Sequence, residues 1–186
     1  MDFPDHPFWD FSLQVYSRDG VGVACIRLQE HHGIDVNIML FCLWLGDSGR
    51  GVVEAEEMDA LRAVSDTWNN EVVKKLRAVR QGLKTDFPDV PESLRENLRA
   101  QVQATEIDAE HIEQLLLAGS IERSAAEGAL TAEKRAGDAN ANFKLYLDTL
   151  GVIFEPADTV NFAHILGQAF PGLSPDLALD LAEVAM

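Results

Sequence analysis

The sequence predicts an all-α protein, a single helical bundle built around a buried apolar central helix. Apolar residues recur three and four positions apart along most of the chain, which is the period of an amphipathic helix, and no stretch alternates as a strand would. Residues 38–45 are apolar without interruption, and a helix without a polar face has to be surrounded by other helices. The length of 186 residues fits one domain, and a hydrophobic fraction of 47% is enough for a sizeable core.

Three helices are expected before residue 50. The first begins near Pro7, because proline is tolerated in the first turn of a helix. The second follows Asp19 as its N-cap and ends at Gly33, which can adopt the left-handed conformation of a C-terminal cap. Asp35 then caps the central helix.

Two long helices follow. Apolar residues from 58 to 83 form one stripe, in which Asn69 and its neighbour indicate a bend, and a second stripe begins after Pro91 and ends before Gly119. A further helix is expected to end near residue 150. We expect the long pair, the first helix and this further helix to enclose the central one.

The C-terminal part is predicted to be a short helical appendage. Asp158 and Ser174 look like the starts of two short helices, so we place a boundary that separates a bundle over residues 1–150 from an appendage over residues 151–186. The appendage has amphipathic helices that would suit docking into a groove of a partner. Its removal is expected to leave the bundle folded.

Charge and cysteine content predict a soluble, cytoplasmic protein. The formal net charge is −16, which disfavours binding to nucleic acid and to anionic membranes. Cys25 and Cys42 match no C-x-x-C pattern and are expected to be buried thiols in a reducing compartment. The acidic N-terminus does not resemble a signal peptide, and the longest apolar run is far shorter than the roughly 20 residues of a membrane span.

No motif for catalysis, metal binding or cofactor binding stands out. The stretch Gly46–Gly49 reads GDSG, but its residues are ordinary turn formers and no partner base is evident. His31 and His32 are adjacent, so on a helix they point about 100° apart and are not expected to hold one ion. We therefore predict no metal, no cofactor and no catalytic residue, and favour a non-enzymatic protein without excluding an enzyme, because catalytic groups can come from distant residues.

A basic run offers the strongest electrostatic signal. Five of the 15 basic residues lie between Lys74 and Lys84, and the following helix is acidic. We favour ion pairs between the two helices, each worth about 0.2–1 kcal/mol where exposed. The alternative is an anion site at Arg77 and Arg80. Asn37, at the start of the central helix, is expected to be buried and to need a partner such as Glu106.

Several stretches together resemble a proteobacterial family of small proteins of unknown function. They cover residues 7–116 and read Phe8-Trp9-x-Phe11-Ser12-Leu13-x-x-Tyr16, Asp35-Val36-Asn37-x-x-Leu40-Phe41-x-x-Trp44, Leu76-Arg77-x-x-Arg80 and Glu106-x-x-x-Glu110-x-x-x-Gln114. The resemblance implies a small soluble bacterial protein and supplies no activity. It also implies a shared polar cluster, formed by Asn37, Arg77, Arg80, Glu106 and Glu110, that either holds helices together or binds something.

The sequence thus favours a protein-interaction or regulatory module whose partner is another protein, with homo-oligomerisation left open. The alternative is a protein or enzyme that binds a small anionic ligand. In that case Arg77 and Arg80 would hold the anion, and Glu106 or Glu110 would transfer a proton.

Overall fold

The computed structural model describes residues 3–183, and within them the chain is helical with no strand, which confirms the all-α prediction. The described elements are α1 (Pro7–Tyr16), α2 (Val21–His32), α3 (Val36–Asp47), α4 (Ala55–Trp68), the π-helical turn η1 (Asn69–Val73), α5 (Lys74–Thr85), α6 (Glu92–Gly119), α7 (Ala132–Leu150), α8 (Pro156–Ala169) and α9 (Pro175–Glu183). None of the helices in this range combines the length and apolar composition needed to cross a membrane.

Helix α3 is the buried central helix that the sequence predicts. Every residue from 37 to 46 is buried. The helix begins at the expected cap, where the Asp35 side chain accepts a hydrogen bond from the backbone N–H of Asn37 at 2.8 Å. Helices α1, α2, α4, α6 and α7 surround it, and α7 makes the most extensive contact. The apolar run therefore lies inside the bundle because no side of it suits water.

Close contact between α3 and α7 depends on Gly46. A Cβ atom at this position would lie 2.6 Å from the backbone nitrogen of Ala139 and in steric conflict with the carbonyl oxygen of Arg135. Both obstacles are backbone atoms of α7, so they cannot rotate away. Gly46 therefore sets the distance between the two helices.

Replacing Gly46 with alanine is expected to destabilise the protein by about 1–3 kcal/mol, because the added methyl group forces α3 and α7 apart. The matched control is Gly137→Ala in α7, where an added Cβ meets nothing within 4 Å. That control is expected to gain about 0.5–1 kcal/mol, since alanine suits a helix interior better than glycine. Urea denaturation of both variants measures the two effects. Equal free energies of unfolding for wild type and Gly46→Ala would contradict the close contact.

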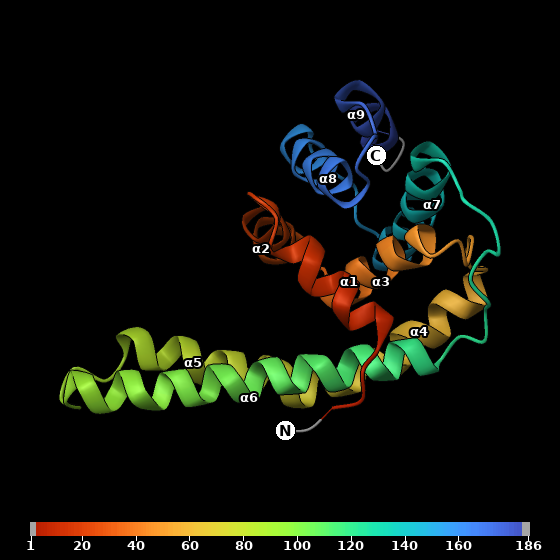
Figure 1. Ribbon diagram of the computed structural model, residues 1–186. Helices are drawn as coiled ribbons and strands as arrows, with labels where there is room; N and C mark the ends of the chain where they lie inside the picture. Colours follow the sequence, from red (N-terminus) through yellow and green to blue (C-terminus); the bar gives the residue numbers. More distant parts are fainter. Residues whose placement is uncertain (1–2, 184–186) are drawn as a thin grey trace.

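Only part of the two long helices encloses α3, because α4 and α6 contact it and α5 does not pack on it. Figure 1 shows α5 and the first half of α6 projecting together from the rest of the molecule as a helical hairpin. We call residues 74–105 the arm. In this fully described stretch Leu83 is the only buried residue, because two helices alone can bury side chains only along the seam between them. A π-helical turn, η1, begins at Asn69, where the sequence predicts a bend.

Helices α8 and α9 pack on the remainder of the bundle. Helix α8 lies against α2, and α9 lies against α8 and α7. Phe154, Phe162 and Phe170 are almost wholly buried and belong to the same hydrophobic core as α3. The ring centroids of Phe143 in α7 and Phe162 in α8 are 4.3 Å apart. The proposed boundary at residue 151 thus crosses a continuous core.

Candidate functional site

Four of the five predicted cluster residues meet where the arm joins the bundle. Arg77 of α5 donates from Nε to Glu106 Oε1 at 2.9 Å and from Nη2 to Glu110 Oε1 at 2.6 Å. Arg80, one helical turn further on, also pairs with Glu106. The side chain of Glu106 is only 5% exposed. These contacts are the ion pairs between the two long helices that the sequence favours.

The charges of this Arg–Glu cluster balance within the chain. Burial raises the pKa of Glu106, but the guanidinium groups of Arg80 and Arg77 outweigh it and hold the pKa below its ordinary value. Burial dominates at Glu110 and keeps its pKa above the ordinary value despite Arg77. The remaining terminal nitrogen of Arg77, Nη1, donates to Gln29 Oε1 of α2 at 2.8 Å. The cluster therefore ties α2, α5 and α6 together with few donors left for a ligand.

Asn37, the fifth predicted residue, lies in a separate buried cluster and does not contact Glu106. Its Nδ2 donates to Glu113 Oε2 at 2.8 Å, and its Oδ1 accepts from Gln114 Nε2 at 2.8 Å. Asn69 of η1 also donates to both oxygens of Glu113, at 3.2 Å each. Glu113 is completely buried, so these amides are its main source of stabilisation. The expected single cluster is divided in two because Glu106 and Glu113 lie two turns apart on α6.

Glu113 shares a hydroxyl group with a second carboxylate. The Ser65 hydroxyl contacts Glu113 Oε1 and lies 3.2 Å from Asp35 Oδ2. A hydroxyl has one hydrogen to donate, so both contacts are hydrogen bonds only if one carboxyl group is protonated. Burial, with the nearby charge of Asp35, raises the pKa of Glu113. The hydrogen bonds of this buried cluster join α3, α4, η1 and α6, and the raised pKa of Glu113 favours the protonated form of its carboxyl group.

Sequence reasoning missed Ser65 and Asn69 as members of this cluster. Ser65 occupies a position in the predicted apolar stripe, where a buried polar side chain must find a partner. This polar residue in an apolar stripe was the available signal, whereas Asn69 was expected only to mark a bend. The π-helical turn brings Asn69 to the inside, and such turns are frequent at functional sites.

A small pocket lies beside the two clusters. It has a volume of about 160 Å³ and is lined by residues of α2, η1, α5 and the loop between α2 and α3, among them Gln29, Asp35, Asn69, Lys74 and Arg77. Pockets for drug-sized ligands measure roughly 300–1,000 Å³. This one has room for a few waters or a small ion only.

The GDSG stretch has a structural role. Ser48 donates its hydroxyl hydrogen to the carbonyl oxygen of Trp44 at 2.6 Å, and Asp47 pairs with Arg135 at 2.6 Å. Both side chains fix the end of α3. The expected turn is present only in the second half of the stretch, because Gly46 and Asp47 are the last residues of α3 and Ser48 and Gly49 form the turn that follows.

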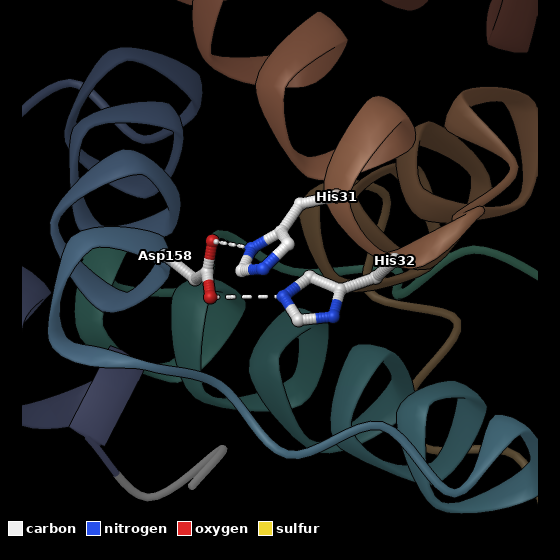
Figure 2. A group of neighbouring side chains, drawn as sticks. All are labelled: His31, His32 and Asp158. Carbon is white, nitrogen blue, oxygen red and sulfur yellow. Dashed lines mark hydrogen bonds and ion pairs between the residues drawn. The ribbon is translucent and has the colours of Figure 1, made fainter.

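The two adjacent histidines do converge on one group, contrary to the sequence-based argument. Figure 2 shows His31 and His32 on the two oxygens of Asp158, with His31 Nδ1 at 3.1 Å from Oδ1 and His32 Nε2 at 2.8 Å from Oδ2. Their Cα–Cβ directions differ as expected, but each ring uses a different nitrogen, and the ring centroids lie 4.1 Å apart. Asp158 belongs to α8, 126 residues after His32, so no local pattern could reveal this group.

The fold and these clusters define an all-α protein whose buried polar side chains join its helices. The chain belongs to a protein family of unknown function, DUF2390, which matches residues 7–117. The matched part ends near the end of α6, so α7, α8 and α9 lie beyond it. No curated protein and no solved structure matches the chain.

Proposed function

We propose that this protein is a non-enzymatic protein-interaction module that docks a partner on its arm. The observation that supports this function is the apolar surface of the arm. Large apolar residues on both helices and on the turn between them are 42–61% exposed, namely Val79, Phe87, Val90, Leu94 and Leu98. Exposed apolar side chains gathered on one projecting element are typical of protein–protein contact sites, and the hairpin that carries these residues projects from the bundle (Figure 1).

The charge of the arm indicates the kind of partner. Residues 74–105 include seven basic and four acidic residues, whereas the whole chain has 15 basic and 31 acidic residues. The arm is therefore net positive on a strongly negative protein. Because opposite potentials favour association and like potentials oppose it, we propose an acidic partner surface around an apolar contact. Two arms from separate copies would repel each other.

The C-terminal helices are less suited to docking than the sequence suggests. The apolar faces of α8 and α9 already lie in the core, where Ile165, Leu166 and Ala182 are wholly buried. A partner would have to displace them from the bundle. The arm offers its apolar residues without such a cost.

Exchanging Leu94 and Leu98 for serine is expected to reduce partner binding at least tenfold while the melting temperature stays close to that of the wild type, because both side chains are exposed. Cross-linking and quantitative mass spectrometry in the native host would identify proteins captured by the wild type. Titration of the purified candidate against each variant then measures the affinity. The matched control is Val160→Ser, an equally exposed position on α8, which should bind as the wild type does.

Two outcomes would contradict this proposal. One is that the wild type and the Leu94 and Leu98 variants capture the same set of proteins. The other is concentration-dependent sedimentation that these exchanges abolish, which would make a second copy of the chain the occupant of the arm.

The pocket beside Lys74 and Arg77 favours a small anion as the second candidate ligand. This alternative has less support, because Arg77 and Arg80 direct their donors to Glu106, Glu110 and Gln29. An anion would have to compete with two carboxylates for the same guanidinium groups. Proton transfer by Glu106 or Glu110 would require breaking the same ion pairs.

A further inference from the structure

We propose that His31, His32 and Asp158 bind a divalent transition-metal ion of the zinc class, which would fasten the C-terminal end of α2 to the N-terminal end of α8. One nitrogen of each ring and one carboxylate oxygen all lie within 4.8 Å of one another. Two imidazoles and a carboxylate are a donor set that suits zinc and similar ions. This inference does not depend on the arm or on its partner.

The present distances are close to those that a metal requires. Zinc–ligand bonds of about 2.0–2.2 Å place tetrahedral ligand atoms roughly 3.3 Å apart, and the two N···O distances here, each to a different oxygen of Asp158, are 3.1 and 2.8 Å. To bind the ion, each neutral ring would present the lone pair of the nitrogen that faces Asp158 and carry its single proton on the other ring nitrogen, so each ring stays neutral. Because the ligand atoms already lie within 4.8 Å of one another, rotation of the three side chains would bring them onto one ion.

The surroundings of the three residues hold them in place. The Asp158 side chain is 5% exposed, and the backbone N–H of Glu155 donates to its Oδ2 at 3.0 Å. The ring of His32 stacks on Phe154, with centroids 5.6 Å apart and an interplanar angle of 27°. Hydrogen bonds and packing of this kind orient metal ligands.

The site also has an open side. The His31 side chain is 50% exposed, against 13% for His32. An ion can therefore enter from solvent and keep water on the side that protein does not cover. Three protein ligands and an open position are typical of zinc sites that hold a water or an exchangeable ligand.

Calorimetric titration of the tag-free, chelator-treated full chain with Zn²⁺ tests the proposal, and Co²⁺ absorption reports the ligand geometry. We expect one ion per chain and a higher melting temperature with the ion bound. His31→Ala and Asp158→Asn should each weaken binding by at least about 100-fold, because changes outside the first shell already cost 10–100-fold. His164→Gln, which alters another histidine on α8, should bind as the wild type does.

His31 is half exposed, so its exchange is expected to leave the fold intact, and a circular dichroism spectrum verifies this for every variant. Absence of binding at micromolar Zn²⁺ would overturn the proposal. So would binding that folded His31→Ala retains, since the ion would then lie elsewhere. Loss of binding in both ligand variants, with His164→Gln unaffected, would support it.

Discussion

Deletion of residues 151–186 is expected to unfold the protein. The segment supplies Phe154, Phe162, Ile165, Leu166 and Phe170, which are 0–3% exposed. Burying one such side chain is worth about 1.5–3 kcal/mol. Five of them together are therefore comparable with the roughly 5–15 kcal/mol of net stability of a typical domain.

The newly exposed apolar faces of the remaining helices would lower the stability further. Helix α8 covers α2, and α9 packs on α7, so deletion would expose parts of both helices. Leu28 in α2 and Phe143 in α7 are wholly buried in the complete chain. Since α7 is the main cover of α3, disturbance at α7 would reach the central helix.

Far-UV circular dichroism and urea denaturation of the truncated chain measure this effect. A point variant tests the same packing without removing the segment: Phe162→Ala should cost about 3–5 kcal/mol, whereas Val160→Ala, at a 61% exposed neighbour, should cost little. Cooperative unfolding of residues 1–150 at the wild-type midpoint would contradict this expectation. It would instead support the independent bundle and appendage that the sequence suggests.

The helices themselves were predictable because their signals are local. Pro7, Gly33 and Asp35 mark the start of α1, the end of α2 and the cap of α3 as expected. The burial of α3 follows from its composition alone. The second helix is an exception, since its N-cap is Gly20 in the left-handed conformation, with φ at 73°, rather than Asp19.

The arrangement of the helices in space was harder to predict from the sequence. A stripe of apolar residues indicates that a helix packs against something, but it does not say how much of its length is covered. The stripe from 58 to 83 therefore did not reveal that its last third lies in the arm. The partner of Asn37 was likewise undetermined, because Glu106 and Glu113 both border the stripe of α6 and only the crossing of α3 and α6 selects Glu113.

Pairs of residues that lie far apart in the sequence could not be predicted, for the same reason. Arg77 and Arg80 could be matched with Glu106 and Glu110 because the two helices follow each other in the chain. His31, His32 and Asp158 meet only through the packing of α2 on α8. Their sequence separation leaves no periodicity to detect.

The contribution of Glu113 to the free energy of unfolding is expected to fall as the pH rises from about 4.5 to about 8, and Glu113→Gln should remove that fall. Burial, with the charge of Asp35, raises the pKa of Glu113 from 4.5 to about 8 in the folded state. Below pH 4.5 the folded and unfolded chains both hold this proton. At higher pH the unfolded chain releases it and the folded chain keeps it, so folding becomes less favourable by up to about 1.4 kcal/mol per pH unit.

Glutamine imitates the protonated carboxyl group, because its amide oxygen still accepts a hydrogen bond from Asn37 and its NH₂ group can donate toward Ser65. Glu113→Gln should therefore match the wild type near pH 5 and exceed its free energy of unfolding at pH 8–9. Urea denaturation between pH 5 and 9 measures the difference between the two proteins, in which the titration of groups common to both cancels. Glu96→Gln, at a partly exposed side chain on the same helix that is 44% accessible, controls for the change in net charge and should follow the wild-type pH dependence. A difference between Glu113→Gln and the wild type that stays constant with pH would show that Glu113 is already ionised at pH 5, and that the amides and Ser65 alone stabilise its charge.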